Sequence, residues 1–308
     1  MSKTFTVHID VDSPVTLAKF YNLQLKDYPI EKLEKFYQIT FERAFEILDR
    51  YGIKATFFCV ACELEASDKI RDVLLRAIEK GHYIANHTYT HPFGLNELSV
   101  SEINDEIGKT NAIFKEKLNI VPIGFRSPGY AIDTAAVNIV EQHGLKYDSS
   151  AGWPVFHVLF KLMRWLKSGK GDQQMQVGFG ETNSRFRRSV YIPNQMNWKK
   201  RDKSGRSFRE YPLAASFFFI PCYTNLHLYF PPAFTRFLLA NTRRHRLMIY
   251  LMHIIEFASL EDDCVPAEII VHPHVKTPVS IKFPKVHNIL NYINRHRNQM
   301  NIEKDYIN

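Results

Sequence analysis

The first half of the chain alternates short apolar runs with longer stretches of helical periodicity. Runs of strand length cover residues 4–12, 53–60, 82–86, 122–126 and 145–148. Helical periodicity lies between them, over residues 31–51, 68–80, 99–118 and 134–143. Gly81 and Gly144 directly follow two of these helices, and Ser99 suits an N-cap. Repeated βα units predict an α/β fold with a parallel sheet, and their number fits an irregular β/α barrel.

The pattern weakens after about residue 153 and returns near the C-terminus. We expect an inserted helical and loop segment over residues 155–210 of a single domain that spans residues 1–308. Residues 155–167 have a wide apolar face and a narrow basic one, which is typical of a helix in a membrane interface and also of an ordinary core helix. Further on, the pattern predicts a helix over 232–242, a strand over 247–252 and a helix over 285–297.

The length and charge of the chain indicate a globular protein with an anionic partner. With 308 residues and 45% hydrophobic content, the chain can bury one large core. A net charge of +8 predicts an anionic partner, either a phosphate-bearing substrate or an anionic membrane surface, and no motif of a nucleic-acid module is present. The N-terminus lacks the features of a signal peptide, so we expect a cytoplasmic protein, peripheral on the inner face of the membrane if it binds lipid.

Two carboxylates and two histidines are the main candidates for chemistry. Asp10 and Asp12 lie at the end of the first predicted strand, where residues two apart point to the same side. His87 and His91 are four residues apart, a spacing that puts both rings on one face of a helical turn. Three such ligands leave coordination positions open, as in a catalytic metal site, and one carboxylate remains to act as a base.

Five short motifs stand in order along the chain. They are Ile9-Asp-Val-Asp12, His87-Thr-Tyr-Thr-His91, Phe125-Arg-Ser-Pro-Gly-Tyr130, Asp148-Ser-Ser-Ala-Gly-Trp153 and Leu251-Met-His253. Together they resemble the polysaccharide deacetylase family with the NodB-type domain, the carbohydrate esterases that remove acetyl groups from sugars. The resemblance implies a distorted β/α barrel of the NodB deacetylase type and a metal-dependent hydrolase that removes an N-acyl group from an aminosugar.

The resemblance also implies a role for each motif residue. Asp12, His87 and His91 would hold one divalent metal ion, and Asp10 would be the general base. Zn²⁺ fits an Asp/His/His set first, with Mn²⁺, Co²⁺ and Ni²⁺ as alternatives.

The remaining motif residues would support the base and the substrate. Arg126 would orient Asp10, and Asp148 would fix Arg126. Tyr130 would offer its backbone N–H to the oxyanion, Trp153 would form an apolar pocket wall, and His253 would protonate the departing amine.

Departures from the common family pattern bear on the substrate. Val11 separates the two aspartates of the first motif, and Gly129 is inserted before the aromatic residue of the third. These features, with Arg209-Glu-Tyr-Pro-Leu213, resemble the subgroup that acts on undecaprenyl-phosphate-linked aminosugars. A lipid-linked or lipopolysaccharide precursor is therefore the expected substrate, with acetyl or formyl as the acyl group.

Three other functions stay open from the sequence. They are a deacetylase of a soluble or polymeric glycan, a metal-independent enzyme that acts on cyclic amides, and a non-catalytic protein that binds sugar or membrane. Retention of the predicted metal ligands argues against the second of these readings, and retention of Asp10 and His253 against the third. His272-Pro-His274 is a competing metal site that lacks a matching carboxylate.

Overall fold

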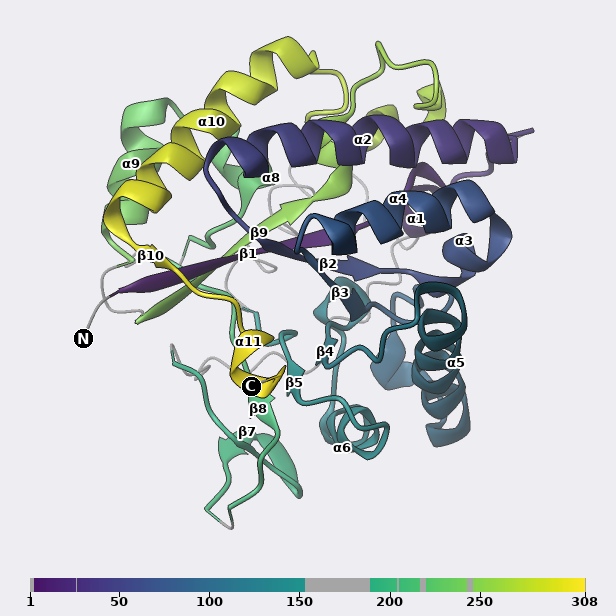
Figure 1. The fold of residues 1–308 in the computed structure, drawn as a ribbon, viewed down its shortest axis with the longest axis vertical. Coiled ribbons are helices and arrows are strands. Elements are labelled where there is room, and N and C mark those ends of the chain that lie inside the picture. The colour runs from purple at the N-terminus through teal and green to yellow at the C-terminus, as the bar shows by residue number, and fades with distance from the viewer. Residues whose placement is uncertain are drawn as a thin grey trace, which may run out of the picture.

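A curled parallel sheet forms the framework of the molecule, and helices cover its outside (Figure 1). The computed structural model describes residues 3–25, 27–152, 189–203, 205–216, 220–242 and 246–307. The sheet runs in the order β10-β1-β2-β3-β4-β5-β8, and β9 also pairs with β1. Its strands are β1 (Thr4–Val11), β2 (Ala55–Cys59), β3 (Tyr83–Asn86), β4 (Gly124–Phe125), β5 (Tyr147–Asp148), β8 (Arg209–Glu210), β9 (Leu247–His253) and β10 (Asn298–Gln299). This half-barrel confirms the predicted fold class.

Strand β1 separates two environments because its side chains alternate between the faces of the sheet. Phe5, Val7, Ile9 and Val11 are buried in the main apolar cluster, which also holds residues of the outer helices. A second cluster includes side chains of β2, β5 and β9, such as Phe58, Tyr147 and Leu251. Thr6, His8 and Asp10, on the other face of β1, are buried too. Polar groups thus enter the inside of the barrel from its central strand.

Four outer helices in the first half of the chain follow the predicted ones closely, namely α2 (Ile30–Arg50), α4 (Asp68–Glu79), α5 (Val100–Leu118) and α6 (Thr134–Gln142). Two short helices, α1 (Pro14–Phe20) and α3 (Ala61–Ala66), were not predicted. Ser99 caps α5 in a full capping box with Glu102, as its position predicted. Gly81 and Gly144 have φ of 80° and 83°, the left-handed conformation that ends a helix after its last turn.

The second half of the chain departs more from the predicted pattern. It holds α8 (Thr224–His227), α9 (Pro232–Ala240), α10 (Val279–His296) and α11 (Lys304–Ile307). Helix α10 begins at Val279 and not at residue 285, because Pro284 lies inside the helix and does not end it. An antiparallel hairpin of β6 (Pro193–Asn194) and β7 (Asn197–Arg201) lies within the predicted insertion. The predicted interfacial helix over 155–167 lies outside the described residues, and the single-domain organisation stays a prediction.

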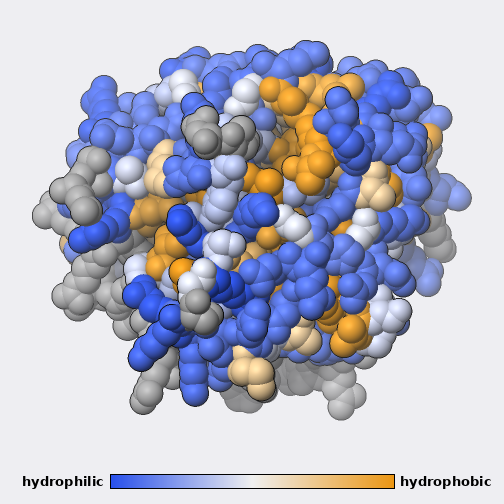
Figure 2. All heavy atoms as spheres, turned by 60° about the horizontal axis from the view of Figure 1, so that its bottom comes forward, coloured by the Kyte–Doolittle hydropathy of each residue, from blue (hydrophilic) through white to orange (hydrophobic). Residues whose placement is uncertain are grey.

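The C-terminal segment closes back onto the barrel strands. Glu303, just before α11, accepts hydrogen bonds from Thr56 Oγ1 on β2 and Tyr147 Oη on β5, both at 2.6 Å. Figure 1 shows the C-terminus beside β5 and β8. The surface in Figure 2 is mainly hydrophilic, with apolar patches among the polar side chains. None of the helices in the described ranges has the length and hydropathy needed to cross a membrane.

Candidate metal and catalytic site

Asp12, His87 and His91 come together just beyond the carboxyl ends of β1 and β3. Asp12 Oδ1 lies 3.2 Å from His91 Nε2 and 3.6 Å from His87 Nε2. All three side chains are buried, and one candidate ligand atom from each lies within 4.8 Å of the others. The structure therefore brings the three predicted metal ligands into one cluster.

The hydrogen bonds of this cluster fit a metal ion. Asp12 Oδ1 and His91 Nε2 are buried without a hydrogen-bond partner, which is costly unless a ligand completes them. His87 Nδ1 lies 2.7 Å from the Arg126 carbonyl oxygen, so Nδ1 carries the proton and Nε2 presents its lone pair toward Asp12. Burial alone would raise the pKa of Asp12, but the neighbouring histidines, His91 first, lower it well below its ordinary value. A divalent cation suits this donor set.

The two histidines do not lie on a helical turn, so that prediction was wrong. Residues 87–91 form a loop in which Thr88 and His91 have φ of 67° and 61°. The left-handed conformation of a β-branched residue such as Thr88 costs about 1–2 kcal/mol. Thr88 Oγ1 accepts a hydrogen bond from His91 N at 3.1 Å, and Asn86 Oδ1 accepts one from Thr88 N at 2.8 Å. The loop thus presents both rings by tight turning and not by helical periodicity.

Asp10 lies beside the cluster with one oxygen engaged and the other facing the site. Arg126 Nη1 donates to Asp10 Oδ1 at 2.6 Å, and both side chains are buried. Tyr130 Oη donates weakly to Asp10 Oδ2 at 3.5 Å. His253 Nε2, across the β1–β9 register, lies 3.7 Å from Asp10 Oδ2 and 3.6 Å from Asp12 Oδ2. Candidate base, candidate acid and candidate ligand therefore converge on one point.

Arg126 is held by groups other than the predicted Asp148. Its Nη2 donates to His8 Nδ1 at 2.7 Å and to Ser149 Oγ at 2.9 Å, and its Nε donates to the Ser149 carbonyl at 2.9 Å. Burial, and then the positive charge of Arg126, lower the pKa of His8 well below its ordinary value, so His8 is neutral and Nδ1 accepts. His8 was missed because a histidine inside a strand carries no sequence signal of its own.

The Asp148 carboxylate is hydrogen-bonded to Ser150 and not to the Arg126 guanidinium, and the predicted role of Asp148 in fixing Arg126 stays a prediction. Asp148 Oδ1 accepts from Ser150 Oγ at 2.5 Å, and Ser150 Oγ accepts from Ser127 N at 2.8 Å. Glu210 on β8 is a buried neighbour, and burial followed by the charge of Asp148 raises the pKa of Glu210 well above its ordinary value. Burial and the charge of Asp148 therefore favour the protonated form of Glu210, whose Oε1 accepts a hydrogen bond from Ala151 N at 2.9 Å.

The backbone N–H of Tyr130 is already occupied, which corrects its predicted role as an oxyanion donor. Tyr130 N donates to the Ser127 carbonyl at 3.0 Å within the short 3₁₀ turn Pro128–Tyr130. The inserted Gly129 has φ of 58°, a conformation natural for glycine, and it makes this turn possible. The side chain of Tyr130 instead points its hydroxyl toward Asp10. Trp153 lies outside the described residues.

His253 is supported by groups that the sequence did not reveal. Its ring lies 5.0 Å from the ring of Tyr223, measured between centroids. Its backbone N–H donates to Glu256 Oε2 at 3.2 Å, and burial raises the pKa of Glu256 to about 8. Tyr223 and Glu256 thus fix the candidate acid at the end of β9.

The competing His272-Pro-His274 site does not form a ligand cluster among the described residues. His274 Nε2 lies 2.6 Å from the Asn225 carbonyl oxygen, and His272 Nδ1 lies 2.9 Å from the Pro273 carbonyl oxygen. Burial, and then the charge of nearby His253, lower the pKa of His272 to about 3. His272 is therefore a buried, neutral side chain at neutral pH.

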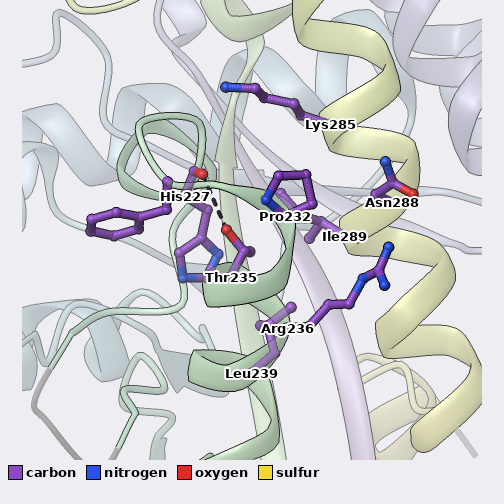
Figure 3. Close-up of a pocket in the computed structure, with 9 residues that line it drawn as sticks. His227, Pro232, Thr235, Arg236, Leu239, Lys285, Asn288 and Ile289 are labelled. Atoms are coloured by element: carbon purple, nitrogen blue, oxygen red, sulfur yellow. Dashed lines mark hydrogen bonds between the residues drawn. The ribbon is translucent and has the colours of Figure 1, made fainter.

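A small cavity between α9 and α10 shares no residue with this site. His227, Thr235, Arg236 and Lys285 line it, and Thr235 Oγ1 donates to the His227 carbonyl at 3.4 Å (Figure 3). Lys285 Nζ donates a hydrogen bond to the Leu228 carbonyl at 2.7 Å, so the ammonium group already has a partner within the protein. Among the described residues that line it, the cavity contains no group of candidate ligands like the cluster of Asp12, His87 and His91.

Comparison with protein families gives a match at the centre of the chain. The polysaccharide deacetylase family model matches residues 33–147. This match supports the resemblance to polysaccharide deacetylases that the motifs indicated. The matched segment contains His87, His91 and Arg126, while Asp10, Asp12 and His253 lie outside it and are brought in by the fold.

Curated relatives match over short segments. A peptidoglycan-N-acetylglucosamine deacetylase of Bacillus cereus is 33% identical over 81 residues, which are 26% of this chain and 28% of that protein. Chitin deacetylase 1 of Cryptococcus neoformans is 34% identical over 100 residues, which are 32% of this chain and 20% of that protein. The chain therefore matches less than a third of the length of either relative.

A solved structure shows the same fold over the whole chain. A Mycobacterium smegmatis protein assigned to the polysaccharide deacetylases superposes with a TM-score of 0.60 at 13% identity, covering 100% of this chain and 90% of that one. At this identity the likeness concerns the fold alone. It agrees with the distorted barrel described above.

Proposed function

We propose that this protein is a metal-dependent hydrolase that removes an N-acyl group from an aminosugar. The observation that carries the proposal is the convergence of Asp12, His87 and His91 with a second carboxylate, Asp10, and with His253. When bound by the three ligands, a divalent ion lowers the pKa of a coordinated water and polarises a carbonyl group.

Asp10 serves as the general base. Arg126 binds Oδ1 and leaves Oδ2 turned toward the site, where it takes a proton from the attacking water. The water oxygen adds to the acyl carbon. The charge-assisted bond from Arg126 holds the carboxylate of Asp10 in the orientation that this step requires.

His253 serves as the general acid. Its Nε2 lies on the side of Asp10 Oδ2 and Asp12 Oδ2, so a proton on Nε2 can pass to the nitrogen as the C–N bond breaks. The products are the free amine of the sugar and the carboxylate of the acyl group. Tyr130 and Tyr223 lie beside these groups and form part of the pocket wall.

The substrate is an N-acylated aminosugar. The two matched relatives are named for N-acetylglucosamine of peptidoglycan and for chitin, which supports an acetylated aminosugar as the reacting unit. The net charge of +8 favours a substrate that carries phosphate, and the first one to test is a polyprenyl-phosphate-linked precursor at an anionic membrane surface.

The test is acetate or formate release from a panel of lipid-linked aminosugars, chitooligosaccharides and peptidoglycan fragments. We expect release from at least one member by the metal-loaded protein, and a loss of about 10³-fold or more for Asp10→Asn with metal content retained. An Asp10→Asn variant that binds sugar and behaves like the parent throughout would favour a non-catalytic sugar-binding protein instead.

A further inference from the structure

Glu106 on α5 is tied to the loop that carries the two histidines. Its Oε2 accepts hydrogen bonds from Tyr89 N at 2.8 Å and from Thr90 N at 2.9 Å. Its Oε1 accepts from Thr90 Oγ1 at 2.6 Å. One carboxylate thus takes three hydrogen bonds from the two residues that lie midway between His87 and His91.

The loop needs such an anchor because its conformation is unfavourable by itself. Thr88 and His91 both have positive φ, and no helical ladder satisfies the backbone between them. Asn86 and Thr88 bind the two ends of the loop, through Thr88 N and His91 N. The middle of the loop is its most exposed part, since Thr90 is exposed and Tyr89 half-buried. Cys62 N donates to the Tyr89 carbonyl at 3.0 Å, and Glu106 binds the two backbone N–H groups of this middle part.

We infer that Glu106 is a positioning residue that fixes residues 87–91 in the shape that binds the metal ion. The inference rests on the proposed function for the identity of the ligand, but the clamp itself can be measured without metal. A ligand set held in place before binding loses less conformational freedom when the ion enters. Outer groups of this kind commonly change metal affinity about 10–100-fold when they are removed.

The chain offers a matched set of variants. Glu106→Ala removes all three acceptor contacts. Glu106→Gln keeps an amide oxygen that can accept from both N–H groups, so it should rescue the loop in part. Asp105→Ala removes an exposed carboxylate from the adjacent position of the same helix and serves as the control.

Two readouts test the inference. In Zn²⁺ titration against a chromophoric chelator, we expect Glu106→Ala to bind at least tenfold more weakly, Glu106→Gln to lie between, and Asp105→Ala to match the parent. In hydrogen exchange of the metal-free protein, the amides of Tyr89 and Thr90 should exchange faster in Glu106→Ala alone among the Ala variants.

The two readouts separate failure of the clamp from failure of the proposed function. A parent protein that binds no metal would remove the proposed function, while fast exchange of the Tyr89 and Thr90 amides in Glu106→Ala would still support the clamp. Unchanged exchange at these amides, or a Glu106→Ala variant that is folded and has the metal affinity of the parent, would overturn the inference.

Discussion

At the scale of single residues, the buried pair of His8 and Arg126 decides where Asp10 points. His8 supplies a neutral acceptor to Arg126 Nη2, while Nη1 of the same guanidinium binds Asp10 Oδ1. The plane of a guanidinium fixes the directions of its N–H groups relative to one another. Any tilt of Arg126 therefore moves the carboxylate of Asp10 as well.

We predict that His8→Leu lowers kcat about 10–100-fold with little change in KM or metal content, because Asp10 loses its fixed orientation. His8→Asn should restore much of the activity, since its amide oxygen can replace Nδ1 as an acceptor. Thr6→Val is a suitable control, because Thr6 Oγ1 is buried on the same strand face without a hydrogen-bond partner. Steady-state kinetics with metal analysis would decide, and full activity of His8→Leu would contradict this account.

Sequence reasoning found the groups with strong chemical identity and missed those that support them. Asp10, Asp12, His87 and His91 are polar residues at strand ends, where a functional site is expected. His8, Glu106 and Glu210 lie inside a strand, on a helix and in a short strand, and each looks like an ordinary polar residue in sequence. Only the fold shows that they face Arg126, the histidine loop and Asp148.

At the scale of elements, regular structure was predictable where local signals agreed. Helix α5 begins after Ser99 and helix α4 ends before Gly81, as caps and periodicity indicated. The loop of residues 87–91 was misread as a helical turn because a spacing of four suits a helix. In the structure Thr88 and His91 have positive φ, and hydrogen bonds to Asn86 and Glu106 hold the loop. Helix α10 was predicted to begin at residue 285, too late by six residues, and Pro284 lies inside it.

At the scale of the whole molecule, the site exists only because the barrel joins distant parts of the chain. Asp10 and His253 are register partners on β1 and β9, although most of the chain separates them. The family model matches residues 33–147, so the base and the acid enter from outside the matched segment. The motifs predicted this convergence, but the contacts that hold each residue required the structure.

Buried histidines make the stability of the whole fold sensitive to acid. Burial lowers the pKa of His227 from 6.5 to about 3, so the folded protein binds a proton at this site less readily than the unfolded chain. This contribution is complete above about pH 6.5 and is lost as the pH falls toward 3. His82, with a pKa lowered by burial to about 4, acts in the same direction.

We therefore predict that the free energy of unfolding decreases as the pH is lowered from 6 to 4. His227→Gln should reduce this slope by about 1.4 kcal/mol per pH unit. Urea unfolding at several pH values would measure the slope. The exposed His296, replaced by glutamine, is the matched control. An unchanged slope in His227→Gln would show that this histidine binds protons equally in the folded and unfolded states and would contradict the prediction.

The central claim is that Asp12, His87 and His91 bind one divalent metal ion, and metal analysis of the purified protein tests it most directly. We predict about one equivalent of metal in the parent after loading and dialysis, and its loss in Asp12→Ala and in His87→Ala, with Asp105→Ala retaining it. A folded parent that holds no metal after loading, or an Asp12→Ala variant that holds as much as the parent, would contradict the account.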